Sequence, residues 1–132
     1  MNRLPRWIGI GLVVASAVLI GAVTLTPTEQ EWWNPVSEDL VDPDVPNLVL
    51  NVILFVPLGI GLSLSGLRAA PAVLCAFAAT IGIEALQIEV IAGRDSSIGD
   101  AVANTLGAAI GVRVARRWRR EAGESTRLAQ IQ

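Results

Sequence analysis

Residues 8–25 read IGIGLVVASAVLIGAVTL, a run of 18 residues without a charged side chain. As an α-helix such a run is long enough to cross a hydrocarbon layer about 30 Å thick. Arg3 and Arg6 precede it, which would also suit a signal peptide. The apolar core is long for a signal peptide, however, and no clear Ala-x-Ala cleavage motif follows it. We therefore expect residues 1–25 to form an uncleaved transmembrane helix with a short basic flank.

Three further apolar runs follow, at residues 48–66, 69–92 and 97–115. The chain has 132 residues, of which 52% are apolar and 17% charged, and a soluble domain this small could not bury so much apolar surface. The sequence therefore predicts an all-α membrane protein, a bundle of four transmembrane helices with the lipid bilayer as its main partner. Residues 47–115 form its three-helix core. Residues 26–46 form an acidic loop, and residues 116–132 form a basic, then polar tail that we expect to fray after Trp118.

The arginines predict the orientation of these spans. The chain has ten Arg and no Lys, and alternating spans place nine of the ten on one side. Arg94 is alone on the other side. Because basic residues favour the cytoplasmic flanks of spans, both termini should be cytoplasmic, with residues 26–46 and 93–96 outside. The cluster at residues 113–120 thus indicates the cytoplasmic side of a multi-pass protein of the plasma membrane, and no nucleic-acid partner is expected.

The composition excludes several kinds of site. The chain has no His, and Cys75 is its single cysteine, so it can form neither an intramolecular disulfide nor a His-based triad or metal site. We expect no metal and no cofactor.

Polar residues from different spans should meet near the outer side of the membrane. Glu84 and Gln87 are three residues apart, and Asp100 and Asn104 are four apart, so each pair shares one face of a helix. A carboxyl group within a span is costly, so Glu84 should face the interior, either neutral or paired with Arg94. The expected polar zone contains six residues: Asn51, Glu84, Gln87, Arg94, Asp100 and Asn104.

These residues carry a resemblance to a known family. The pattern N-x-x-x-F-x-P-x-G runs from Asn51 to Gly59, and D-x-x-x-N-T-x-G-x-x-x-G runs from Asp100 to Gly111. With E-x-x-Q at Glu84 and the later Arg94, residues 51–111 resemble the VanZ-like family. The resemblance implies a small multi-helix protein of the bacterial envelope. The family's namesake is associated with low-level resistance to teicoplanin-type glycopeptides, so antibiotic resistance is an implied role.

Each polar residue also has a structural interpretation. Asp100 suits the amino terminus of a helix, where acids stabilise the dipole. Arg94 also suits a solvated turn. The amides of Asn51, Gln87 and Asn104 are typical of contacts between membrane helices. Four residues are expected to serve helix packing: Pro57, which should bend its helix, Gly59, Gly107 and Gly111.

Three classes of function remain open. The favoured one is a protein that binds or modulates an amphiphilic envelope ligand with an anionic head, either a lipid-linked wall precursor or a lipoglycopeptide. The second is an intramembrane hydrolase or transferase with Glu84 and Asp100 as acid and base, although no nucleophile motif supports an enzyme. The third is a structural subunit or scaffold for a membrane partner.

Overall fold

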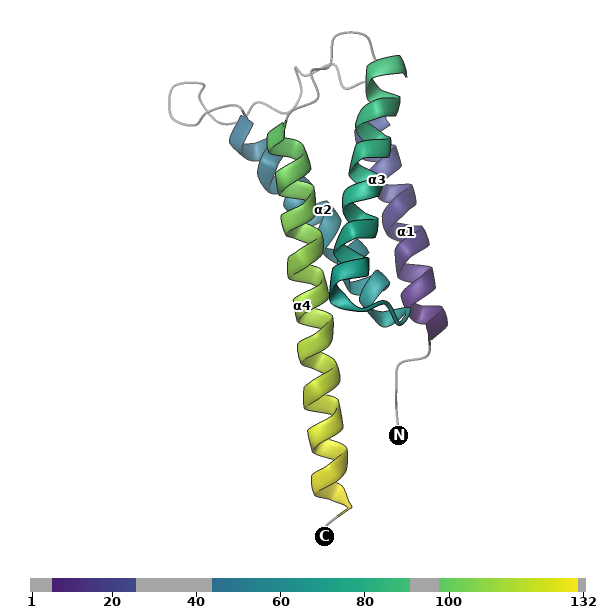
Figure 1. Ribbon diagram of the computed structural model, residues 1–132, viewed down its shortest axis with the longest axis vertical. Coiled ribbons are helices and arrows are strands. Elements are labelled where there is room, and N and C mark those ends of the chain that lie inside the picture. Colours follow the sequence, from purple (N-terminus) through teal and green to yellow (C-terminus); the bar gives the residue numbers. More distant parts are fainter. Residues whose placement is uncertain (1–5, 26–43, 91–97, 131–132) are drawn as a thin grey trace.

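The computed structural model describes residues 6–25, 44–90 and 98–130, apart from the side chains of residues 24, 25, 44, 86–90 and 126–129. These residues form four helices and no strand. The helices are α1 (Arg6–Leu25), α2 (Asp44–Leu64), α3 (Ala69–Val90) and α4 (Ile98–Ala129). In Figure 1, α1 and α3 run upward while α2 and α4 run downward, so consecutive helices alternate in direction. The prediction of an all-α chain is confirmed.

Two of the described helices are long and apolar enough to cross a membrane, α1 over Arg6–Val23 and α2 over Val45–Leu64. α3 holds a shorter apolar stretch, Ala69–Ala85. All four helices expose large apolar side chains on their outer faces, among them Val18, Ile53, Leu74 and Val102. Outward apolar faces on every helix suit a lipid environment. Two membrane-spanning helices are thus supported by length and composition, and four spans and their orientation stay predictions.

α2 and α4 run in parallel and share the most extensive contact in the bundle (Figure 1). Glycines make this approach possible. A Cβ added to Gly107 would overlap the carbonyl oxygen of Val52, and one added to Gly111 would overlap that of Val56. From the other side, a Cβ at Gly59 would overlap the carbonyl of Ala108. Main chain therefore lies directly on main chain, as small residues allow between membrane helices.

The remaining helices pack on this pair. α1 approaches α2 where Gly9 lies close to Gly61. The buried core is apolar and includes side chains from all four helices: Ile20, Leu54, Phe55, Leu58, Ala76 and Ala108. Two buried hydroxyl groups bond to their own helices, since Ser16 donates to the carbonyl of Leu12 and Thr80 to that of Ala76, whereas the buried Ser63 hydroxyl has no partner among the described residues. Such bonds satisfy polar groups where water is excluded.

α2 ends in a tight turn. Gly66 has a φ of 110°, and the N–H groups of Gly66 and Leu67 donate to the carbonyls of Ser63 and Leu62. This is the Schellman pattern, in which a residue without a Cβ adopts the left-handed conformation. The Arg119 side chain of α4 also donates to the carbonyl of Ser63. A cation thus sits at the negative end of the α2 dipole, although the last turn of α2 has no basic residue of its own.

The structure corrects two expected boundaries. α2 begins at Asp44, so Pro46 lies in the first turn of a helix, where its missing N–H costs nothing, rather than at the end of a loop. The expected fraying after Trp118 is wrong, because α4 continues to Ala129. An ion pair between Arg117 and Glu121 stabilises this part of the helix, because residues four apart lie on the same face and the two groups are 2.9 Å apart. The segment is also rich in Arg, Glu and Ala, which are good helix formers.

Candidate functional site

The polar site begins with a hydrogen bond between α2 and α4. The Asn51 side-chain amide donates to Oδ1 of Asp100 over 2.7 Å. Asp100 lies in the first turn of α4, where its charge also favours the helix dipole. The two helices are held in this register by the contacts of Gly59, Gly107 and Gly111, which lie about two to three turns further along. Asn51 and Asp100 therefore meet because close packing of α2 on α4 fixes both of them.

Glu84 extends this group from α3. It lines a groove together with Ile98 and Ala101 of α4, which lie on either side of Asp100 in the first turn of that helix. Its Oε1 atom is buried and has no hydrogen-bond partner within the described part of the chain. A buried carboxyl oxygen without a donor is unfavourable, because it loses its contacts with water and gains none in return. Glu84 thus has an unused acceptor inside the bundle.

Asn104 lies one turn below Asp100 on α4. Its side chain is only 7% exposed, and its Oδ1 atom is also buried without a partner among the residues described. The adjacent Thr105 hydroxyl donates to the Ala101 carbonyl of its own helix over 2.7 Å. The buried atoms of Glu84 and Asn104 that lack a partner are therefore both acceptors, and the Asn51 amide of α2 already donates to Asp100.

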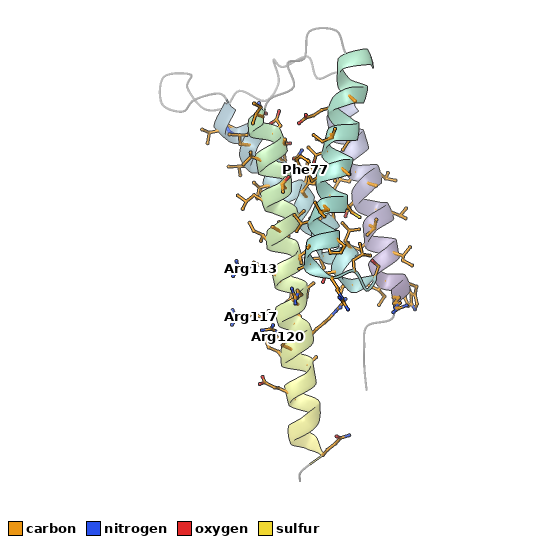
Figure 2. All side chains as sticks on the ribbon, in the orientation of Figure 1. Phe77, Arg113, Arg117 and Arg120 are labelled. Carbon is orange, nitrogen blue, oxygen red and sulfur yellow. The ribbon has the colours of Figure 1, made fainter. Side chains whose placement is uncertain are left out.

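A groove of about 700 Å³ opens between α3 and α4 beside Glu84. Phe77 and Ile81 line it from α3, and Figure 2 labels Phe77 between the two helices. The α4 wall is formed by six residues: Ile98, Ala101, Val102, Thr105, Leu106 and Ala109. Glu84 is the one ionisable residue in this lining. The groove is therefore open at the surface of the bundle and mostly apolar, with one carboxyl group in its wall.

The structure leaves two predicted site residues undecided. Arg94 lies outside the described residues. Gln87 belongs to α3, but its side chain lies outside the description.

Pro57 lies within α2, which continues through it without interruption. Within the three described segments, no cluster of three His, Cys, Asp or Glu side chains is arranged to hold a metal ion.

The groove is the part of the site that the sequence analysis missed. A signal for it exists in α4, where Ala101, Thr105 and Ala109 recur every four residues and form a stripe of small side chains. Such a stripe leaves space beside a neighbouring helix, but it can equally bring that helix closer. Only the position of α3 in the structure shows that the space stays open.

Apolar outer faces, helices of spanning length and a buried polar group between them define a small helical protein of the membrane type. A family model described as VanZ/LLP1 matches residues 12–119, and the chain belongs to this family. The match begins inside α1, so the family region is longer than residues 51–111, which carry the motifs. No curated protein and no solved structure matched the chain.

Proposed function

We propose that this VanZ-like protein crosses the plasma membrane four times with both termini in the cytoplasm. The alternating helix directions support this, because α1 begins and α4 ends at the same end of the bundle (Figure 1). Among the described residues, that end also carries seven exposed arginines: Arg6, Arg68, Arg113, Arg116, Arg117, Arg119 and Arg120. A concentration of exposed cations at one end is typical of the cytoplasmic side.

Within this frame, the chain binds an amphiphilic ligand of the bacterial envelope in the groove between α3 and α4. The observation that carries this proposal is Glu84, whose buried Oε1 lacks a donor while its side chain lines an apolar groove. Ionisable groups inside membrane helices are costly and usually serve function. A ligand that donates a hydrogen bond to Glu84 would remove part of that cost.

The groove and the polar group fit different parts of one amphiphile. A volume of about 700 Å³ is within the usual range for sites that hold small ligands. Phe77, Ile81 and Leu106 would contact an alkyl chain, since they line the groove with apolar surface. The free acceptors of Glu84 and Asn104 favour a head with hydroxyl or amine donors. Arg94, four residues after the end of α3, would pair with an anionic part of the same head.

Two amphiphiles combine these properties, a lipid-linked wall precursor and a lipoglycopeptide of the teicoplanin type. Each carries an apolar tail and a head rich in hydrogen-bonding groups. Binding of either one would change how a glycopeptide acts on the cell wall. Membership of the VanZ/LLP1 family supports a contribution to glycopeptide resistance.

A deletion strain tests this proposal. It is challenged with a teicoplanin-type lipoglycopeptide and with the same glycopeptide lacking its acyl chain, and is complemented with the wild type, Glu84→Gln or Arg94→Ala. We expect deletion to raise sensitivity to the acylated compound, and Arg94→Ala to restore resistance only in part. Protein level is measured in each membrane fraction.

The outcomes separate the three classes of function. A phenotype that follows protein level alone would indicate a scaffold and contradict ligand binding. Complete loss with Glu84→Gln at normal protein level, together with full activity of Arg94→Ala, would point to acid–base chemistry instead. Equal sensitivity of the deletion strain and its parent to both compounds would contradict the resistance role.

A further inference from the structure

α4 carries a row of arginines that continues its outer apolar face. Val102, Leu106 and Ile110 are 61%, 52% and 39% exposed. Steps of three and four residues lead from Ile110 to Arg113, Arg117 and Arg120, which we call the arginine row. Because such steps stay on one face of a helix, the surface that is apolar through Ile110 becomes cationic one turn later.

The arginine row points away from the bundle. Figure 2 shows Arg113, Arg117 and Arg120 on the side of α4 turned away from the other helices. All three are exposed, and the Arg117 side chain is 82% accessible. Arg117 pairs with Glu121 at 2.9 Å, an exposed contact that is weak in water.

The rotation of α4 about its axis is fixed next to the row. Arg119 points to another side of the helix and donates to the Ser63 carbonyl at the end of α2. Gly107 and Gly111 hold the preceding turns against α2. The arginine row therefore cannot turn inward without breaking these contacts.

We propose that the arginine row binds the headgroups of anionic phospholipids in the cytoplasmic leaflet. This rests on the proposal that α4 crosses the membrane with its carboxyl end in the cytoplasm. Lipid tails would then cover Ile110, and the headgroups of the same lipids would lie further along α4, beside the arginine row. Guanidinium groups bind phosphate with two parallel hydrogen bonds as well as by charge.

Trp118 provides a reporter at this place, because it follows Arg117 directly and is 53% exposed. The full chain, with its other three Trp residues replaced by Phe, is reconstituted in bilayers of phosphatidylcholine with a minor fraction of phosphatidylglycerol. Two samples are prepared, one with bromine on the acyl chains of phosphatidylcholine and one with bromine on those of phosphatidylglycerol. In each sample, the quenching of Trp118 fluorescence reports the local amount of the brominated lipid. The ratio of the two quenching values gives the enrichment of phosphatidylglycerol over its bulk fraction.

We expect phosphatidylglycerol to be enriched at Trp118 by at least about fivefold over its bulk fraction. The attraction of a single Arg to an anionic membrane surface typically changes a binding equilibrium by about this factor. The triple variant Arg113→Gln, Arg117→Gln, Arg120→Gln should bring the enrichment close to one, whereas the matched triple Lys variant should keep most of it. Glu121→Gln should increase enrichment because it releases Arg117. High salt should reduce it in the wild type.

Three results would overturn the inference. The first is quenching by brominated phosphatidylglycerol that matches its bulk fraction in the wild type. The second is enrichment that persists in the triple Gln variant. The third is absence of quenching by either brominated lipid, which would show that the end of α4 does not reach the bilayer. Ligand binding in the groove beside Glu84 is measured separately, so the two proposals can fail independently.

Discussion

The contact between α2 and α4 should depend on the absence of a side chain at Gly107. In Gly107→Ala, the new Cβ would overlap the carbonyl oxygen of Val52, with the Val52 carbonyl carbon and Cα both at 3.0 Å. These are backbone atoms, so no rotamer change can relieve the overlap and the helices must move apart. Gly82 on α3 is a matched control, because a Cβ there has nothing within 4 Å.

The magnitude follows from two opposing effects. Replacing Gly by Ala within a helix stabilises it by about 0.5–1 kcal/mol, because Gly loses more conformational freedom on folding. Extra atoms in a well-packed contact cost about 1–3 kcal/mol. Gly82→Ala should therefore be slightly more stable than the wild type. The first effect is common to both variants, so Gly107→Ala should be less stable than Gly82→Ala by about 1–3 kcal/mol.

The free energy of unfolding is measured by reversible titration of the purified chain from mild detergent micelles into sodium dodecyl sulfate, with helix content followed by circular dichroism. Equal stability of Gly107→Ala and Gly82→Ala would refute the reasoning. It would mean that α2 and α4 do not lie backbone to backbone. The register that places Asn51 beside Asp100 would then lose its basis.

Other variants test separate contacts. Arg119→Ala removes the cation from the end of α2 and should lower the free energy of unfolding by about 0.3–1 kcal/mol, whereas the exposed Arg120→Ala should leave it unchanged within error in the same titration. In a double-mutant cycle, Asn51→Ala and Asp100→Ala should show a coupling of about 0.6 kcal/mol, the average for hydrogen bonds between membrane helices, and additive effects would contradict the bond. Glu84→Gln should reach wild-type levels in membranes on immunoblots, because the amide keeps the shape of the carboxyl; strong loss of protein would assign Glu84 to folding rather than ligand binding.

The helices could be predicted from the sequence because each is encoded locally. An apolar run gives the position of α1 and of α3 to within two residues at either end. The end of α4 was mispredicted for a physical reason. The run stops near Ala115, where hydropathy changes, but helix formation does not require apolar residues, and Arg, Glu and Ala continue the helix.

The polar site could be predicted only in part. When consecutive helices alternate in direction, the position of each residue along its helix predicts that Asn51, Glu84 and Asp100 lie at the same end of the bundle. The hydrogen-bond partner of each group cannot be predicted in this way, because it depends on how far each helix is rotated about its axis. Arg119 illustrates this, since charge alone placed it among the cytoplasmic arginines, whereas the structure directs it to the Ser63 carbonyl. The groove was missed because it is a property of two helices together.

The most direct test of ligand binding fills the groove without changing Glu84. Ala109 lines the groove, and Ala109→Phe would occupy the space proposed for the acyl chain. Ala78 is an exposed alanine of α3 that does not line it, so Ala78→Phe is the matched control. The measurement is equilibrium binding of the acylated glycopeptide to each full-length variant in nanodiscs. We expect Ala109→Phe to weaken binding by at least about tenfold, which corresponds to about 1.4 kcal/mol, and Ala78→Phe to match the wild type. Equal affinity of all three proteins would contradict binding in this groove.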